Sequence, residues 1–180
     1  MDIYTIGHST HDKDTFVSML KAHDIETLVD VRSYPSSRYC PHFNKENMEQ
    51  WVTENNIRYL HMPELGGRRR KLYGIDESLV NGWTHVSFKN YAAYTFTDEY
   101  ERGINKLLRI AEKERIAYFC SECLPWKCHR SIISNTLTAL GINVYHIMNE
   151  TKIEERQLGK YGAMPKIVNN KVIYPKQDVK

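Results

Sequence analysis

The sequence contains no apolar run near the ~18–20 residues that a membrane-spanning helix requires. Its first residues, MDIYTIGHST, also lack the basic segment and apolar stretch of a secretory signal peptide. We therefore expect a cytoplasmic protein that does not bind membranes. In that compartment the four cysteines stay reduced, which leaves them free for catalysis, metal binding or burial in the core.

Internal repeats, low-complexity segments and a strong charge excess are also absent. The 180 residues have the composition of an ordinary globular protein and predict a single domain over 1–180. The net charge of +3 is compatible with an anionic ligand but does not require nucleic acid. A shift to polar, weakly periodic sequence near Asn149 divides the domain into a core (1–149) and a C-terminal appendage (150–180).

Short apolar segments alternate with helical patterns along the core. Strands are expected at Ile3–Gly7, Thr27–Ser33, Ile57–Met62, Ile116–Cys120 and Asn143–Ile147. Helices are expected after Thr10 or Asp12, after Asn44, after Thr97 and from about Lys127 to Leu140, with a long loop from Arg68 to Asn90 and a terminal hairpin that turns at Asn169-Asn170. This alternation predicts an α/β fold with three layers, a mostly parallel sheet of about five strands with helices on both faces.

Polar residues follow four of these strands at their carboxyl ends, the edge where open α/β sheets bind ligands. In chain order they are His8 and Ser9, then Asp30, Arg32 and Arg38, then Glu64, Gly66 and Gly67, and finally the cysteine-rich segment FCSECLPWKCHRS (119–131). Because these side chains converge on one edge of the sheet, we expect the functional site there.

The cysteine-rich segment offers two candidate nucleophiles. A helix N-terminus and neighbouring cations lower the pKa of a thiol, so we expect Cys120 at the strand end to react first and Cys128 in the helix's first turn second. His8 and His129 are candidate acids or bases, and Glu64 or Glu122 orients one of them. The predicted substrate contacts are Ser9, Asp30, Arg32, Arg38, Gly66, Gly67, Trp126 and Arg130, with the arginines holding an anion.

Two other interpretations of the segment remain open. Cys-x2-Cys followed by Cys-His resembles zinc spacing, but a second half-site is missing, and Cys128 and His129 are expected to point apart as neighbours on a helix. No metal or other cofactor is therefore predicted. Cys120 and Cys123 are spaced like a redox pair, yet Pro125 and Trp126 separate them from the helix that such pairs open directly.

The main basic run is RRRK, Arg68, Arg69, Arg70 and Lys71. Runs of charge are usually solvated loops. The functional interpretation is a contact with the phosphates of a nucleotide or a nucleic acid, with nearby tyrosines stacking on bases.

Several motifs resemble the domain-of-unknown-function family 488: TIGHST, LVDVRSYPSSR, PELGG, SFKNYAAYTFT and CSECLPWKCHR. They cover most of residues 1–147, and the resemblance implies an α/β fold with an active site around the Cys-His-Arg motif, without implying a reaction. More faintly, TLVDVRS and the strand–cysteine loop–helix unit are similar to rhodanese-like domains. That similarity implies Cys120 as nucleophile and Arg130-Ser131 as the end of its loop, although the loop here is longer and lacks glycine.

These observations predict an enzyme, a thiol- or His/Glu-dependent hydrolase or group transferase acting on a small anionic substrate such as a nucleotide or a nucleic-acid base. The alternative is a non-enzymatic module that binds nucleotides or nucleic acid through RRRK. A zinc-binding structural domain is a third possibility. The sequence does not determine the oligomeric state.

Overall fold

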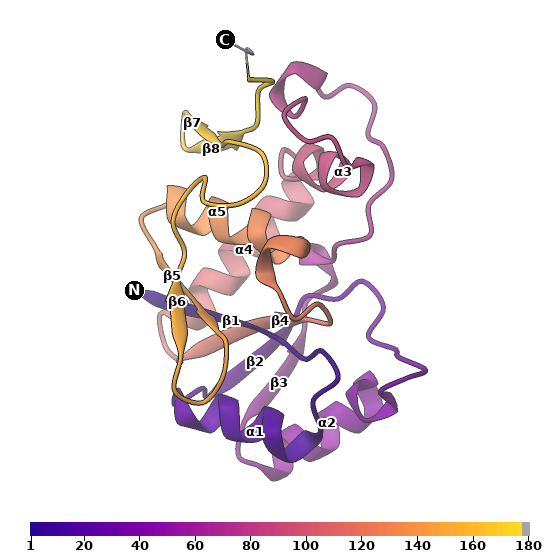
Figure 1. Ribbon diagram of the computed structural model, residues 1–180, viewed down its shortest axis with the longest axis vertical. Coiled ribbons are helices and arrows are strands. Elements are labelled where there is room, and N and C mark those ends of the chain that lie inside the picture. The colour runs from indigo at the N-terminus through magenta and orange to yellow at the C-terminus, as the bar shows by residue number, and fades with distance from the viewer. Residues whose placement is uncertain (178–180) are drawn as a thin grey trace.

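A computed structural model describes residues 1–177. Its six-stranded sheet has the order β3-β2-β4-β1-β5-β6 (Figure 1). The parallel strands are β1 (Asp2–Gly7), β2 (Thr27–Asp30), β3 (Arg58–His61), β4 (Ile116–Cys120) and β5 (Asn143–Ile147), and β6 (Ile153–Glu155) runs antiparallel beside β5. The predicted α/β class and mostly parallel sheet are confirmed, and β6 adds a strand that the sequence did not predict.

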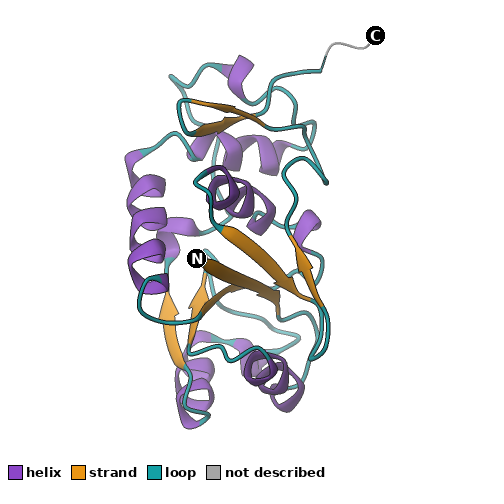
Figure 2. Ribbon diagram, turned by 90° about the vertical axis from the view of Figure 1, so that its left-hand side faces the viewer, coloured by secondary structure: helices purple, strands orange, loops and turns teal. Residues whose placement is uncertain are grey.

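Helices cover both faces of the sheet (Figure 2). One apolar cluster joins the sheet to α1 (Lys13–Ala22) and α2 (Lys45–Glu54), and a second joins it to α3 (Val86–Tyr94), α4 (Asp98–Ala111) and α5 (Arg130–Ala139). The sequence determines where two of these helices begin, because the side chains of Asp12 and Thr97 accept the backbone N–H bonds that cap α1 and α4. The Thr97 cap was predicted, and Asp12 was one of the two residues considered for the other cap.

The connections of the sheet leave a crevice at its carboxyl edge. β1 and β2 lead into α1 and α2 on one face, whereas β4, which lies between them, leads into α5 on the other face. Because neighbouring strands connect to helices on opposite faces, the loops that follow them diverge at the carboxyl ends of the strands. The ends of β1, β4 and β2 therefore surround an opening.

The C-terminal segment is more than a surface appendage. β6 extends the sheet, and the side chains of Arg156, Val172 and Tyr174 are buried against the second apolar cluster or α5. The predicted hairpin is present as β7 (Lys166–Val168) and β8 (Lys171–Ile173), with positive φ at both turn asparagines as a tight hairpin requires. Residues 178–180 of the predicted appendage lie outside the described residues.

Two boundaries differ from the prediction in ways that affect the site. α5 begins at Arg130 rather than near Lys127, because Pro125 starts a short 3-10 helix, η4 (Pro125–Lys127), after which Cys128 is extended at φ −134° and ψ 150°. α3 lies partly where a loop was predicted, since its helical pattern is weak and tertiary packing stabilises it. Within residues 1–177 no helix has the length and apolarity to cross a membrane.

Candidate active site

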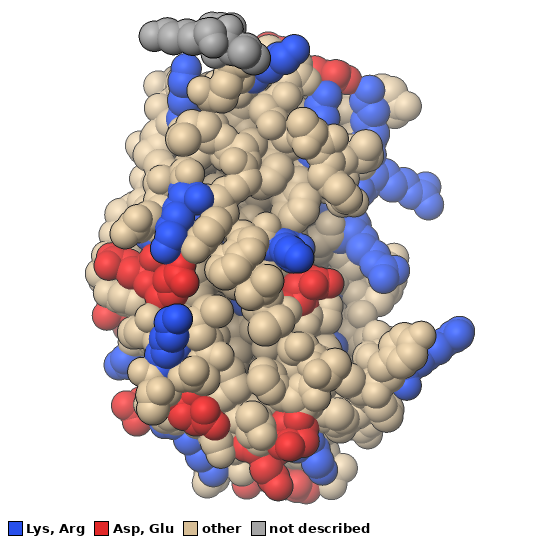
Figure 3. Space-filling view, in the orientation of Figure 1, with Lys and Arg blue, Asp and Glu red and all other residues tan. Residues whose placement is uncertain are grey.

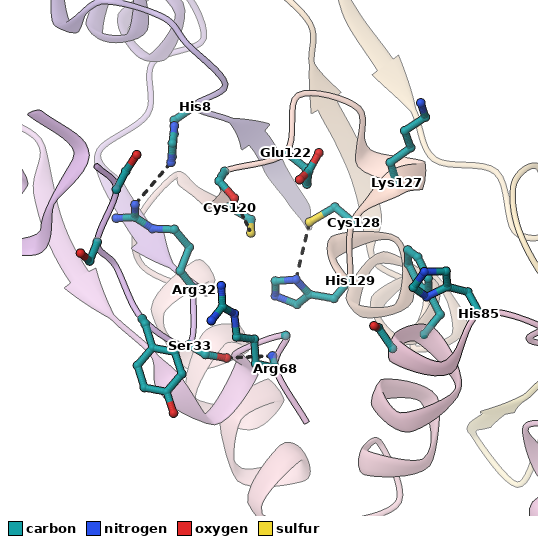
Figure 4. A pocket seen from close by; sticks show the side chains of 17 residues that line it. His8, Arg32, Ser33, Arg68, His85, Cys120, Glu122, Lys127, Cys128 and His129 are labelled. Carbon is teal, nitrogen blue, oxygen red and sulfur yellow. Dashed lines mark hydrogen bonds between the residues drawn. The ribbon is translucent and has the colours of Figure 1, made fainter. Parts of the chain in front are cut away.

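A pocket of about 480 Å³ opens at the carboxyl ends of β1, β2 and β4. This volume falls in the range of small-molecule sites, and the position is the sheet edge at which the sequence predicts a site. The labelled residues in Figure 4 show how it is built from distant segments: His8, Arg32, Ser33, Arg68, His85, Cys120, Glu122, Lys127, Cys128 and His129.

Two sulfur atoms and an imidazole meet in this pocket. The sulfurs of Cys120 and Cys128 and one ring nitrogen of His129 all lie within 4.8 Å of one another. Nε2 of His129 donates to the carbonyl oxygen of Val31 at 2.9 Å, and because a carbonyl only accepts, Nε2 carries the proton. Nδ1 is then unprotonated in the neutral ring and faces the Cys128 sulfur at 3.5 Å.

The two thiols have opposite protonation tendencies. Burial raises the pKa of Cys128, but the neighbouring Cys120 thiol and the charge and backbone N–H of Arg130 at the start of α5 outweigh it, which lowers the pKa to about 6. The nearby Cys128 sulfur and burial raise the pKa of Cys120 to about 12. These opposite shifts favour a thiolate at Cys128 beside a thiol at Cys120. The geometry favours Cys128 as the first nucleophile, the reverse of the order expected from the sequence.

Arg32 is held rigidly in the pocket wall. The carboxylate of Asp30, which is fully buried, accepts from its Nε at 2.9 Å and its Nη2 at 2.6 Å, so the two side chains form a buried ion pair. The hydroxyl of Tyr59 also donates to Asp30, at 2.6 Å. Asp30 therefore orients Arg32 and does not itself line the pocket.

His8 is neutral and supports Arg32. Its Nδ1 donates to the carbonyl oxygen of Ser9 at 2.8 Å, its ring stacks on Phe43 at 4.2 Å, and burial lowers its pKa to about 4. The remaining nitrogen, Nε2, accepts from Nη1 of Arg32 at 3.3 Å. Because this nitrogen is engaged, His129 rather than His8 is the histidine placed to move a proton at a sulfur.

Arg130 was predicted to hold an anion, but the structure buries it beneath the pocket. Only 1% of the residue is exposed, and its guanidinium donates to Oγ1 of Thr5 at 2.9 Å and to the backbone carbonyls of Glu122 and Cys123. Arg130 therefore fixes the cysteine loop from below and does not reach a ligand in the pocket.

Two glycines let backbone segments approach the site closely. A Cβ on Gly7 would overlap the backbone carbonyl of Glu122, so only glycine at the end of β1 accommodates the cysteine loop. A Cβ on Gly67 would overlap the ring of His129. Gly67 lines the pocket, and Gly66 is buried against Ser33 behind it.

Several predicted residues are not brought to the pocket. Glu64 faces α4, where one carboxylate oxygen lies 3.4 Å from Nζ of Lys106. Trp126 stacks on Tyr161 at 4.4 Å and so holds the C-terminal segment. Ser9 and Arg38 also lie outside the pocket lining, whereas Glu122 is exposed at the rim.

The basic run RRRK divides by role. Arg68 is exposed and lines the pocket, and Arg70 is exposed. Arg69 turns inward, donates to the carbonyls of Gly66 and Pro63 and lies 3.8 Å over the Tyr94 ring, while Lys71 pairs with Glu77 at 2.8 Å. In Figure 3 Lys and Arg side chains project from the right-hand edge, where the loops coloured purple and magenta in Figure 1 run.

Some pocket residues were not among the predicted site residues, although the segments 33–37 and 119–131 were expected at this edge. They are Ser33, Tyr34, Ser36, Ser37, His85, Ser87, Phe88, Ser121 and Lys127. Those from 85–88 belong to the start of α3 or just precede it, and the motif SFKNYAAYTFT, although noticed, was not placed at the sheet edge because that segment was assigned mainly to a loop.

The same three groups could hold a metal ion. Two thiolates and an imidazole nitrogen are donors that zinc uses. Their ligand atoms lie close together, so the expectation that Cys128 and His129 point apart is wrong. The extended backbone at Cys128, rather than a helical one, turns both side chains inward. A closed structural site needs four protein ligands. In the part of the chain that the structure describes, no further histidine, cysteine or carboxylate joins the cluster as a fourth ligand.

Comparison with known proteins agrees with the motifs. A family model described as "Domain of unknown function DUF488" matches residues 12–137, a span that includes β2 to β4 and most of α5. No curated protein and no solved structure matches the chain. The matched segment contains both cysteines of the pocket and His129, and the chain belongs to the DUF488 family.

Proposed function

We propose that this protein is an enzyme that uses the Cys128 thiolate for hydrolysis or group transfer on a small anionic substrate. One observation carries the proposal: the Cys128 sulfur lies at the N-terminus of α5, in a pocket of about 480 Å³, with Nδ1 of His129 at 3.5 Å. A thiol beside a correctly oriented histidine is the arrangement that activates a cysteine nucleophile. Keeping this thiol reduced suits the cytoplasm.

The roles follow from the geometry. Cys128 attacks the electrophilic atom of the substrate and forms a covalent intermediate as the leaving group departs. The leaving group takes its proton from solvent. Nδ1 of His129, which is unprotonated, accepts the proton of the water or second acceptor that attacks next, while the carbonyl of Val31 holds the ring in place through Nε2. Water or a second acceptor then releases the group from the sulfur. The version based on a histidine and Glu64 has less support, because Glu64 faces α4.

The charge of the pocket lining supports an anionic substrate. Arg68 and Lys127 are exposed at its rim and Arg32 forms part of its wall, whereas Glu122 is the one carboxylate among its lining residues. Tyr34 and Phe88 add aromatic surface on which a base can stack. A nucleotide or a nucleic-acid base is therefore the substrate class to test first.

The preference for anions can be measured without knowing the substrate. We expect anionic iodoacetate to alkylate Cys128 faster, relative to neutral iodoacetamide, in the native protein than in Arg68→Gln or Lys127→Gln. The ratio of the two rates should fall several-fold in these variants and also as salt rises to about 0.5 M, because salt screens exposed charges. Mass spectrometry would follow the Cys128 peptide.

Lys113→Gln is the matched control, since Lys113 is exposed before β4, at the opposite end of that strand from the pocket. It should leave the ratio unchanged. A ratio insensitive to Arg68, Lys127 and salt would remove the case for an anionic substrate.

A second candidate function is binding of single-stranded nucleic acid without catalysis. It is supported by Tyr34, Tyr39 and Tyr73, which are 72%, 97% and 89% exposed on loops that also carry Arg38, Arg68 and Arg70. Exposed aromatic rings among cations are the elements of such surfaces. This function predicts oligonucleotide affinity that falls steeply with salt and is lost in Arg70→Gln. Affinity that does not respond to salt would exclude it.

A further inference from the structure

The second pocket thiol, Cys120, has no task in the simple nucleophile scheme. Its sulfur is within 4.8 Å of the Cys128 sulfur. Both residues are buried, at 8% and 3% exposure, yet both line the pocket, so a substrate that reaches one sulfur also reaches the other. The sequence suggested pairing Cys120 with Cys123 instead, but Cys123 is exposed and is not among the pocket residues.

We propose that Cys120 and Cys128 form a dithiol–disulfide couple that reduces an anionic disulfide bound in this pocket. Cys128 is the attacking thiol and Cys120 the resolving thiol. The inference rests on the proposed reactivity of Cys128, and it specifies the electrophile as a sulfur atom.

The reaction balances in two steps. The Cys128 thiolate attacks one sulfur of the substrate disulfide, a Cys128–substrate S–S bond forms, the substrate S–S bond breaks, and the first thiolate leaves. Cys120 then gives its proton to Nδ1 of His129 and attacks the Cys128 sulfur. The Cys120–Cys128 bond forms, and the second thiolate leaves and takes up the proton. The substrate gains two electrons and the protein dithiol loses two.

The closeness of the two sulfurs gives the steps their order. While Cys128 is a thiolate, its negative charge close to the Cys120 sulfur, together with burial, raises the pKa of Cys120 and keeps Cys120 protonated. Once Cys128 is bonded to the substrate it no longer carries a charge, and this cause disappears. Cys120 therefore becomes easier to deprotonate when its attack is needed.

The geometry requires little rearrangement. Disulfide bonds have a sulfur–sulfur distance of about 2 Å, so the sulfurs, now at most 4.8 Å apart, must approach by less than about 3 Å. Cys120 ends β4 and Cys128 lies in the extended segment between η4 and α5, where side-chain rotation and a small shift of the loop can bring the sulfurs together.

The test uses 5,5′-dithiobis(2-nitrobenzoate), an anionic disulfide whose thiol product is coloured. The protein carries Cys40→Ser and Cys123→Ser, so that only the pocket pair reacts. We expect two equivalents of coloured thiol per chain, and non-reducing mass spectrometry should find the peptides of Cys120 and Cys128 linked. Adding Cys120→Ser should halve the yield and leave a stable adduct on Cys128.

The outcomes separate the two proposals. If the protein that retains Cys120 releases only one equivalent of coloured thiol and keeps a stable adduct on Cys128, the resolving role of Cys120 is overturned. The proposed function would still stand in that case. Failure of Cys128 to react at pH 7 would overturn both. Linked peptides from the chain with all four cysteines provide a second readout that does not depend on the folding of any variant.

Discussion

Replacing Asp30 with asparagine should lower the free energy of unfolding by about 3–5 kcal/mol, the usual cost of removing one partner of a buried ion pair. Asp30 is fully buried and accepts two bonds from the guanidinium of Arg32, which is itself 6% exposed, so the substitution leaves a buried guanidinium without its counter-charge. Urea denaturation at pH 7 measures the change.

Two further variants make this prediction specific. In the double variant Asp30→Asn with Arg32→Gln, the loss should be smaller than in Asp30→Asn alone, because no charge remains buried. The exposed helix pair of Lys45 and Glu49 provides the control, and Glu49→Gln should change the free energy of unfolding by less than about 0.5 kcal/mol. Equal effects of Asp30→Asn and Glu49→Gln would show that Arg32 is not held as described.

Gly7→Ala should damage the pocket more than any conservative change in its lining. The added Cβ overlaps the carbonyl of Glu122, which is backbone and already accepts from Arg130, so the cysteine loop must move. We expect a loss of about 1–3 kcal/mol in the free energy of unfolding. The pKa of Cys128 should also rise toward that of an ordinary thiol as its contacts with Cys120 and Arg130 loosen.

Gly103→Ala is the matched control, because it adds the same methyl group at a buried glycine of α4. Its nearest neighbour is the end of the Leu65 side chain, which can rotate away, and alanine favours the helix. This variant should leave the pKa of Cys128 unchanged. The same pKa in Gly7→Ala as in the native protein would contradict the close fit at β1.

The sequence predicts the sheet and the edge that carries the pocket, since apolar strands and capped helices follow from local patterns. Asp12 and Thr97 cap α1 and α4 where expected. The identity of the more acidic thiol could not be predicted, because it depends on where α5 begins. Pro125 delays that helix to Arg130, so Cys128 lies in the extended segment just before the helix and not within its first turn.

The burial of individual side chains also could not be predicted from local sequence. Arg130 carries a guanidinium that could bind an anion, yet it is enclosed between β1 and the cysteine loop. Glu64 was predicted to be a catalytic carboxylate, but its side chain contacts α4. Both outcomes depend on contacts between segments far apart in the chain, which residue patterns do not encode.

The central claim is that Cys128 is a thiolate at neutral pH. Its rate of alkylation by iodoacetamide, followed from pH 5 to 10 by mass spectrometry, tests this directly. The account predicts a half-maximal rate near pH 6 for Cys128, with Cys120 unreactive until far higher pH. A midpoint for Cys128 near 8.5, the value of an unperturbed thiol, would contradict it.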